Sequence, residues 1–366
     1  MKKCLLSFLA TLVLLQLPCI AQAQPVQKLP AASAVEVRQV KENPLFLEEE
    51  VLHLKLSMDM KTVLKDRGDD RVYHPATIWY KDSTGTRVAQ ALKVKVRGNR
   101  RRDPSVCGFP PLMLNFSRST VENTVFGKVN KLKLVTHCTG EEYVLREYLA
   151  YKMYNILTDS SFRVRLCQVT YEDVQGKKKS ETKYAFLVED EDALAERLNA
   201  TVLPDELVVG MRGTHLPSTA VLTFFQYMIG NTDWSVPYRH NIKVLNINAF
   251  AIPVPYDFDY AGCVSAPYAA PPPELEISSV KERLFRGYSY PDTVYAQVRN
   301  LFNLRKAALY GLYQNADLLE EKSSKSTLKY LDEFYTTLNN AKKFERSFVE
   351  AGQRNERGGV AVKGLD

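Results

Sequence analysis

The sequence lacks the short motifs that define several common classes of enzyme site. It has only 6 cysteines and 2 tryptophans among 366 residues, and no two cysteines have the CxxC spacing of thiol-redox or zinc sites. No GxSxG turn, HExxH pair or GxxxxGK[ST] loop occurs. The sequence therefore gives no indication of a serine hydrolase, a zinc protease or a P-loop nucleotide site.

The N-terminus has the order of a cleavable signal peptide. Lys2 and Lys3 precede an apolar run of about 13 residues, which is too short to span ~30 Å of hydrocarbon. Ala21-Gln22-Ala23 then supplies the small residues of a cleavage site. We predict a signal peptide over residues 1–23 and an exported mature chain, periplasmic or extracellular, with no membrane span.

Charge and cysteine content agree with that setting. The formal net charge is +7, and loss of two lysines with the signal peptide leaves about +5. This excess suits anionic ligands but is too small to indicate nucleic acid as a partner. Four cysteines remain, which permits two disulfides in an oxidising compartment. Cys107 and Cys138 flank neighbouring predicted strands, so we predict that they are bonded, with Cys167 and Cys263 as the second pair.

The hydrophobic pattern changes from strands to helices near residue 190. Residues 24–45 are rich in Gln, Ala and Pro and predict a flexible leader. Alternating apolar residues predict strands at 52–60, 76–80, 87–97, 112–116, 131–135, 162–171 and 183–188. Helices are expected at 141–157, 192–199, 217–229, 291–313 and 324–351, with short strands at 242–247 and 251–254 and a disordered tail over 352–366. We predict an α+β fold with a strand-rich lobe over 46–190 and a helical lobe over 191–351.

Polar residues concentrate in two predicted loops between residues 230 and 262. Asp233, His240, Asn241, Asp257 and Asp259 lie on loops that the hairpin of strands 242–247 and 251–254 would bring together. Phosphoryl transfer needs such a set, because one carboxylate orients the acceptor hydroxyl while an amide oxygen and a second carboxylate hold magnesium. Each residue alone could cap a turn or pair with an arginine, but the ordered set favours a site.

This set is similar to the catalytic segments of a known family. Asp233-Trp234, His240-Asn241 and Tyr256-Asp257 resemble those of the spore-coat protein H (CotH) kinase family, atypical members of the protein-kinase-like fold. Upstream, Arg97-Gly98-Asn99 resembles the family's RGN turn, and the segment around Glu147, LREYLAY, resembles its αC-like helix.

The resemblance spans residues 90–265 and implies a two-lobed kinase-like fold with one αC-like helix in the strand-rich lobe. It also implies ATP with Mg²⁺ or Mn²⁺. Asp233 would be the catalytic aspartate, Asn241 and Asp257 the metal ligands, and Asp259 an auxiliary acid at the metal.

Glu147 has apolar neighbours three and four positions away on its helix, so we expect it to be buried. A buried carboxylate requires a partner. Alternation in the strand over 131–135 places Lys131 and Lys133 on one face. We predict that Glu147 pairs with Lys133, with Lys131 as the alternative, and that this lysine and Arg97 grip nucleotide phosphates. The alternative is a solvent-facing strand edge. The arginines at 100–102 are expected at a solvated surface or an acidic-partner site.

Three functions follow from this reasoning. The first is an exported CotH-like kinase that transfers phosphate from ATP to Ser or Thr hydroxyls of a protein. The second is a pseudokinase-like binding module that keeps the cleft without turnover. The third is a cell-surface protein that binds acidic polymers through its arginine cluster.

Overall fold

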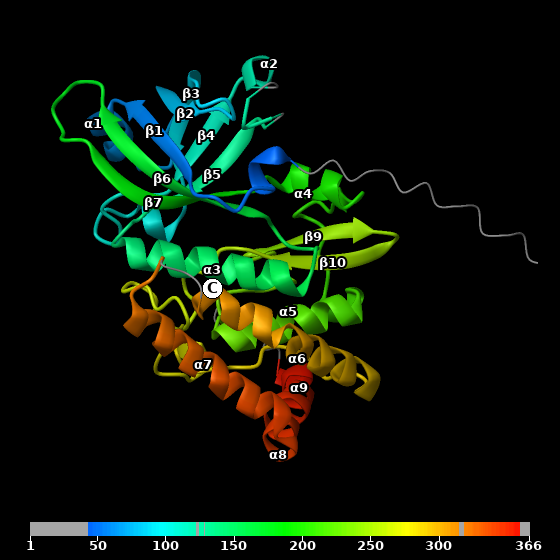
Figure 1. Ribbon diagram of the computed structural model, residues 1–366. Helices are drawn as coiled ribbons and strands as arrows, with labels where there is room; N and C mark the ends of the chain where they lie inside the picture. Colours follow the sequence, from blue (N-terminus) through cyan, green and yellow to red (C-terminus); the bar gives the residue numbers. More distant parts are fainter. Residues whose placement is uncertain (1–42, 122–123, 128, 315–317, 359–366) are drawn as a thin grey trace, which may run out of the picture. The chain divides into compact units, whose positions relative to one another are not determined.

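The computed structural model of the chain describes residues 43–121, 124–127, 129–314 and 318–358 (Figure 1). The predicted signal peptide and most of the predicted leader lie outside the described residues, as does the tail from residue 359. In the described part of the chain, no helix combines the length and the apolar character needed to cross a bilayer.

The strand-rich part of the chain forms a closed barrel of seven strands. Its strands are β1 (Leu52–Met58), β2 (His74–Lys81), β3 (Arg87–Val96), β4 (Leu112–Phe116), β5 (Lys131–Val135), β6 (Val164–Asp173) and β7 (Glu181–Val188). Neighbouring strands pair antiparallel, except that β1 also pairs in parallel with β6 and so closes the barrel in the order β1-β2-β3-β4-β5-β7-β6. Closure removes the open strand edges that would otherwise invite pairing with another chain.

Apolar residues at alternate positions along each strand fill the inside of the barrel. Leu54 and Leu56 of β1, Leu112 and Leu114 of β4, and Leu132 and Leu134 of β5 belong to one buried cluster. Successive side chains of a strand point to opposite faces. Lys131 and Lys133 therefore lie on one face of β5, as alternation predicted, and in the closed barrel this is the outer face.

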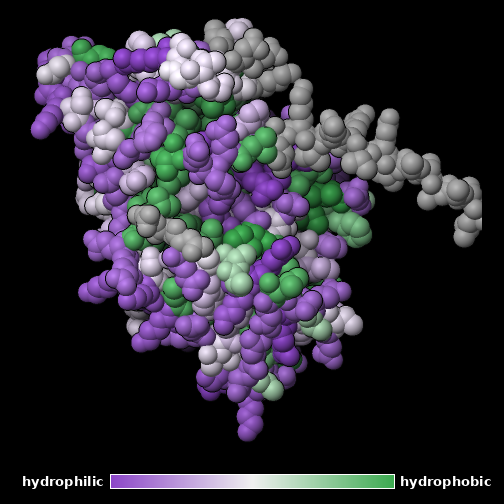
Figure 2. Space-filling view, viewed as in Figure 1, coloured by the Kyte–Doolittle hydropathy of each residue, from purple (hydrophilic) through white to green (hydrophobic). Residues whose placement is uncertain are grey.

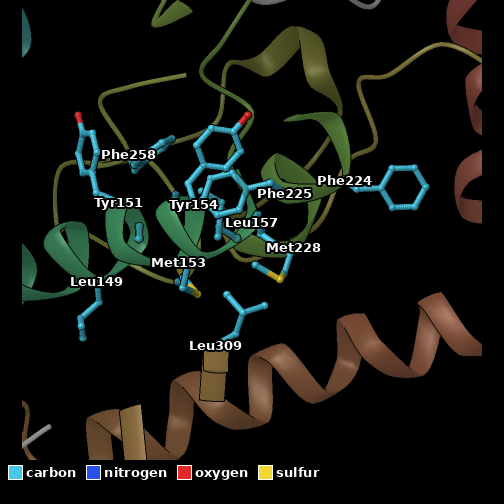
Figure 3. Packing of buried hydrophobic residues seen from close by; sticks show 14 of the residues in the cluster. Leu149, Tyr151, Met153, Tyr154, Leu157, Phe224, Phe225, Met228, Phe258 and Leu309 are labelled. Carbon is cyan, nitrogen blue, oxygen red and sulfur yellow. The ribbon is translucent and has the colours of Figure 1, made fainter. Parts of the chain in front are cut away.

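Helix α3 (Glu141–Leu157) connects the barrel to the helical part of the chain. It contacts β6 and β7 and also α5 (Leu216–Ile229) and α6 (Asp292–Gln314). Figure 1 shows α3 between the barrel and these helices, and Figure 3 shows Tyr151 and Tyr154 of α3 in the same apolar cluster as Phe225 of α5 and Phe258. The ring centroids of Tyr151 and Phe258 are 4.6 Å apart. This packing fixes the segment after β10 relative to α3.

The remaining elements complete the helical part. They are α4 (Glu191–Arg197), β8 (Thr201–Val202), β9 (Ile242–Ile247), β10 (Phe250–Pro255), α7 (Glu321–Asn339), α8 (Ala341–Phe344), a π-helical turn (Glu345–Val349) and α9 (Glu350–Gly358). The single helix predicted over 324–351 is interrupted at Asn340, whose side chain caps α8. The prediction of disorder from Gly352 is wrong as far as Gly358, because this segment is helical.

The predicted two-lobed protein-kinase-like fold with one αC-like helix is wrong. The strand-rich half is a closed barrel, and it carries α1 (Met60–Lys65) and α2 (Arg118–Val121) besides α3. One hydrophobic cluster contains Val164 and Phe186 of the barrel strands together with residues of α3, α5, α6 and α7. Local periodicity identified the strands, but it could not reveal that β1 pairs with β6 more than a hundred residues further along the chain.

The cysteines divide between a bonded pair and two buried thiols. The predicted disulfide between Cys107 and Cys138 is confirmed, and it joins the segment before β4 to the turn that precedes α3. The second predicted pair is wrong, because Cys167 lies in the barrel core whereas Cys263 lies in the cluster of the helical part. The face drawn in Figure 2 is mainly hydrophilic, in keeping with a chain of which 25% is charged.

Candidate functional site

Asp233 lies on the loop that follows α5, and two side chains of the same loop hold its carboxylate. His240 Nε2 is 2.7 Å from Asp233 Oδ1, and Asn241 Nδ2 donates to Asp233 Oδ2 at 2.9 Å. The Trp234 side chain is 1% exposed, and its indole N–H donates to the Asn231 carbonyl. Burial of the indole fixes the loop and leaves the Asp233 carboxylate 24% exposed to solvent.

The hairpin of β9 and β10 brings the second predicted loop to the first. The backbone N–H of Tyr256 donates to the Asn241 carbonyl at 3.0 Å, which places Asp257 directly beside Asn241. Asp257 has a left-handed backbone (φ 61°), and its N–H donates to Tyr151 Oη at 2.7 Å. The structure therefore brings Asp233, Asn241 and Asp257 together through a continuous chain of contacts.

Arg101 is the centre of a buried ionic cluster that sequence reasoning did not find. Its Nη1 donates to Glu147 Oε2 at 2.8 Å, its Nη2 pairs with Asp257, and its Nε lies 3.1 Å from Asp259 Oδ2. The exposed fractions of the Arg101 and Glu147 side chains are 6% and 3%. Tyr268 Oη also donates to Asp259 Oδ2, at 3.0 Å.

Two predictions about charged side chains are wrong. Glu147 is buried as predicted, but its partner is Arg101 rather than Lys133 or Lys131, because the turn of residues 100–102 inserts a guanidinium between α3 and Asp257. The expectation of a solvated arginine cluster fails at Arg101 for the same reason. Arg102 instead pairs with the exposed Asp69, at 2.6 Å.

The cluster shifts the pKa values of Asp257 and Asp259 in opposite directions. Burial raises the pKa of Asp259 well above its usual value, and the Asp257 and Glu147 carboxylates raise it further against the opposing effect of Arg101. Burial also acts to raise the pKa of Asp257, but the guanidinium of Arg101, with Arg97 and Lys133, brings it below its usual value. Among the three carboxyl groups around Arg101, Asp257 is therefore the one whose ionised form its surroundings favour.

Lys133 and Arg97 lie close to Asp257 without an ion pair. The Lys133 ammonium is 4.8 Å from the centroid of the Tyr256 ring, and burial together with the positive Arg97 lowers its pKa to about 8. Among the described residues, no carboxylate oxygen lies within salt-bridge distance of either cation. Lys131, two residues earlier on β5, is exposed.

The nearby carboxylates already serve other groups. Glu191 pairs with Lys243 at 3.1 Å, and Asp190 accepts from the backbone N–H of residue 192 at the start of α4. Asp257 forms an ion pair with Arg101. Lys133 is thus a partly buried cation without a salt-bridge partner among the described residues.

The donor set does not fit the predicted metal ion. The Asp257 and Asp259 carboxylates are directed at Arg101, and the cavity lined by Arg101, Glu147 and Asp259 measures about 10 Å³, which is at most the space of one water molecule. The amide nitrogen of Asn241 donates to Asp233, so only its amide oxygen is left as a donor to a metal. In the described part of the chain, no group of three or more His, Cys, Asp or Glu side chains is arranged to hold a metal.

Several residues of the site were missed from the sequence. Arg101 follows the RGN turn. The available signal was that the predicted buried Glu147 needs a cation as its partner. Arg286 had no signal: its guanidinium is fully buried with no hydrogen-bond partner among the described residues, and burial lowers its pKa to about 10 while Asp233 opposes that change.

Two larger cavities, of about 380 and 400 Å³, are lined by residues around His137 and around Tyr288 and do not include Lys133 or Asp257.

Comparison with known proteins adds no family to these observations. No family model matches the chain, and no curated protein has a significantly similar sequence.

Proposed function

We propose that this chain binds a phosphate-bearing ligand, such as a nucleotide, at Arg97 and Lys133. The observation that carries the proposal is the partly buried Lys133 ammonium, which lies 4.8 Å from the centroid of the Tyr256 ring, feels the charge of Arg97 and has no salt-bridge partner among the described residues. Burying a cation without a partner is costly. An anion between the two side chains would remove that cost and the repulsion between them.

Phosphate suits this pair of cations better than a carboxylate does, because it has more negative charge and a third oxygen. A guanidinium can bind two of its oxygens in a planar fork, and an ammonium can bind another as a point charge. The Tyr256 ring lies beside Lys133 and is partly exposed, whereas Phe162 behind it is buried. A partly exposed aromatic ring can stack on a nucleotide base.

Thermal unfolding with added ATP tests the proposal, since a ligand that binds only the folded state must raise stability. At a hundredfold excess over the dissociation constant the gain is about 2.7 kcal/mol, a rise of several degrees in melting temperature. Lys133→Met and Arg97→Met should abolish the rise, whereas Lys131→Met on the same strand should keep it. An equal rise in all four proteins would place the ligand elsewhere.

A second candidate function is transfer of phosphate from ATP to a Ser or Thr hydroxyl of a protein, as in the CotH-like kinases. The observation that favours it is Asp233, whose partly exposed carboxylate is oriented by His240 and Asn241. In this reaction the hydroxyl oxygen bonds to the terminal phosphorus of ATP, its proton passes to Asp233, and ADP leaves.

Asp233→Asn separates the two functions. Binding alone predicts that this variant and the wild type bind ATP equally and that neither transfers phosphate. The kinase predicts transfer by the wild type to a protein substrate, with turnover falling by a hundredfold or more in the variant while ATP binding is kept. For either function we place the protein outside the cytoplasm, and the Cys107–Cys138 disulfide is compatible with an oxidising compartment.

A further inference from the structure

We propose that the guanidinium of Arg101 takes the place of a divalent cation at Asp257 and Asp259, so that this site binds phosphate-bearing ligands without a metal. Only the ligand in this inference rests on the proposed function. The claim about Arg101 itself stands on its contacts with three carboxylates.

The contacts of Arg101 are those of a cation at the centre of its ligands. Nη1 and Nη2 donate to Glu147, Nη2 also donates to Asp257, and Nε lies 3.1 Å from Asp259 Oδ2, so all three nitrogens face a carboxylate. An arginine side chain does not lose its proton in proteins. The cluster therefore contains a permanent positive charge, supplied by the chain itself.

The chain segment that follows Arg101 is held by side-chain hydrogen bonds and by the disulfide. Arg67 donates to the carbonyls of Cys107 and Gly108, at 2.7 and 2.8 Å, and Cys107 is bonded to Cys138. These contacts hold the segment that leaves the turn of residues 100–102. The cavity of about 10 Å³ that Arg101, Glu147 and Asp259 line leaves little room for a hydrated ion on that side of the arginine.

The surrounding charges favour an anion over a second cation. Arg97 and Lys133 lie near Asp257, in addition to Arg101, which forms an ion pair with it. Arg101 offsets the charge of the carboxylates that it contacts, and Arg97 and Lys133 add positive charge near Asp257. A divalent cation would be repelled there, whereas phosphate oxygens would be attracted.

Two measurements on the wild type test the inference. The rise in melting temperature caused by ATP should be the same in excess EDTA and in excess MgCl₂. Free Mn²⁺, followed by electron paramagnetic resonance, should not decrease when the protein is added. A rise that requires Mg²⁺, or wild-type binding of Mn²⁺ that Asp257→Asn abolishes, would overturn the inference and leave phosphate binding intact.

The matched variants are Arg101→Met and Arg102→Met, neighbours in one turn of which only the first contacts the carboxylates. Arg101→Met should gain Mn²⁺ binding and a Mn²⁺-dependent rise in melting temperature, because three carboxylates lose their shared cation. Arg102→Met should gain neither. A folded Arg101→Met that binds no Mn²⁺ would contradict the cation role of Arg101.

The wild-type measurements decide the question where Arg101→Met does not fold. If ATP raises the melting temperature under neither condition, the proposed function fails. The Mn²⁺ measurements then still decide the role of Arg101.

Discussion

Replacing Lys133 with methionine should make the unliganded protein more stable. The ammonium lies beside the rings of Tyr256 and Phe162, and no salt bridge offsets its burial among the described residues. Methionine removes the charge, and its thioether packs favourably against aromatic rings. The substitution should therefore stabilise the fold while it abolishes binding of a phosphate-bearing ligand.

The size of the effect follows from the pKa of Lys133. Burial, with Arg97 nearby, lowers this pKa from 10.5 to about 8. Each pKa unit corresponds to about 1.4 kcal/mol, so holding the charge in the folded state costs at most about 3 kcal/mol at neutral pH. The side chain keeps some contact with solvent. We expect Lys133→Met to raise the free energy of unfolding by about 1 to 3 kcal/mol.

The gain in the free energy of unfolding of Lys133→Met must also depend on pH. Because the folded pKa lies below the unfolded one, the unfolded wild type binds more protons between pH 8 and 10.5, and wild-type stability rises with pH across that window. The advantage of the variant should therefore be largest at pH 7 and smaller at pH 9.5, as measured by urea unfolding. Lys131→Met should stay within about 0.5 kcal/mol of the wild type. A variant less stable than the wild type at pH 7, or an advantage that does not change with pH, would refute the reasoning.

Three further predictions concern other parts of the structure. Cys107→Ser opens a disulfide between residues 31 positions apart and should lower the free energy of unfolding by about 3 to 4 kcal/mol; chemical reduction of the wild type should have the same effect, and unchanged stability in urea would count against it. The hydrogen bond to Asp233 raises the pKa of His240. This pair therefore stabilises the fold below pH 6.5, and the contribution is lost as pH rises through the raised pKa. NMR titration of Asp233→Asn should show the imidazole pKa returning toward 6.5, and no change would rule out the coupling. Gly230→Ala should lower the free energy of unfolding in urea by about 3 kcal/mol or more, because Gly230 has φ +69° and a Cβ there would overlap a tyrosine hydroxyl. Gly85→Ala, at φ +82° in open space, should lower it by about 1 kcal/mol. Equal losses in the two variants would contradict the overlap.

The sequence by itself determined the local elements and the burial of single residues. Alternation placed the leucines of β4 and β5 in the core and Lys133 on the outer face, because side chains of a strand alternate between its faces whatever the strand pairs with. Helical spacing predicted that Glu147 is buried, and the left-handed Gly230 ends α5 where a helix stop was expected. The turn between β9 and β10 likewise brings Asn241 and Asp257 together over a short stretch of chain.

The tertiary structure alone decided which distant residues meet. The parallel pairing of β1 with β6 closes the barrel, and no pattern within either strand encodes the other as its partner. The partner of Glu147 was decided in the same way. Lys131, Lys133 and Arg101 could each supply the charge that a buried carboxylate needs, since electrostatics specifies only the sign. The path of the chain around Cys107 selects Arg101, and with it the cation that Asp257 faces.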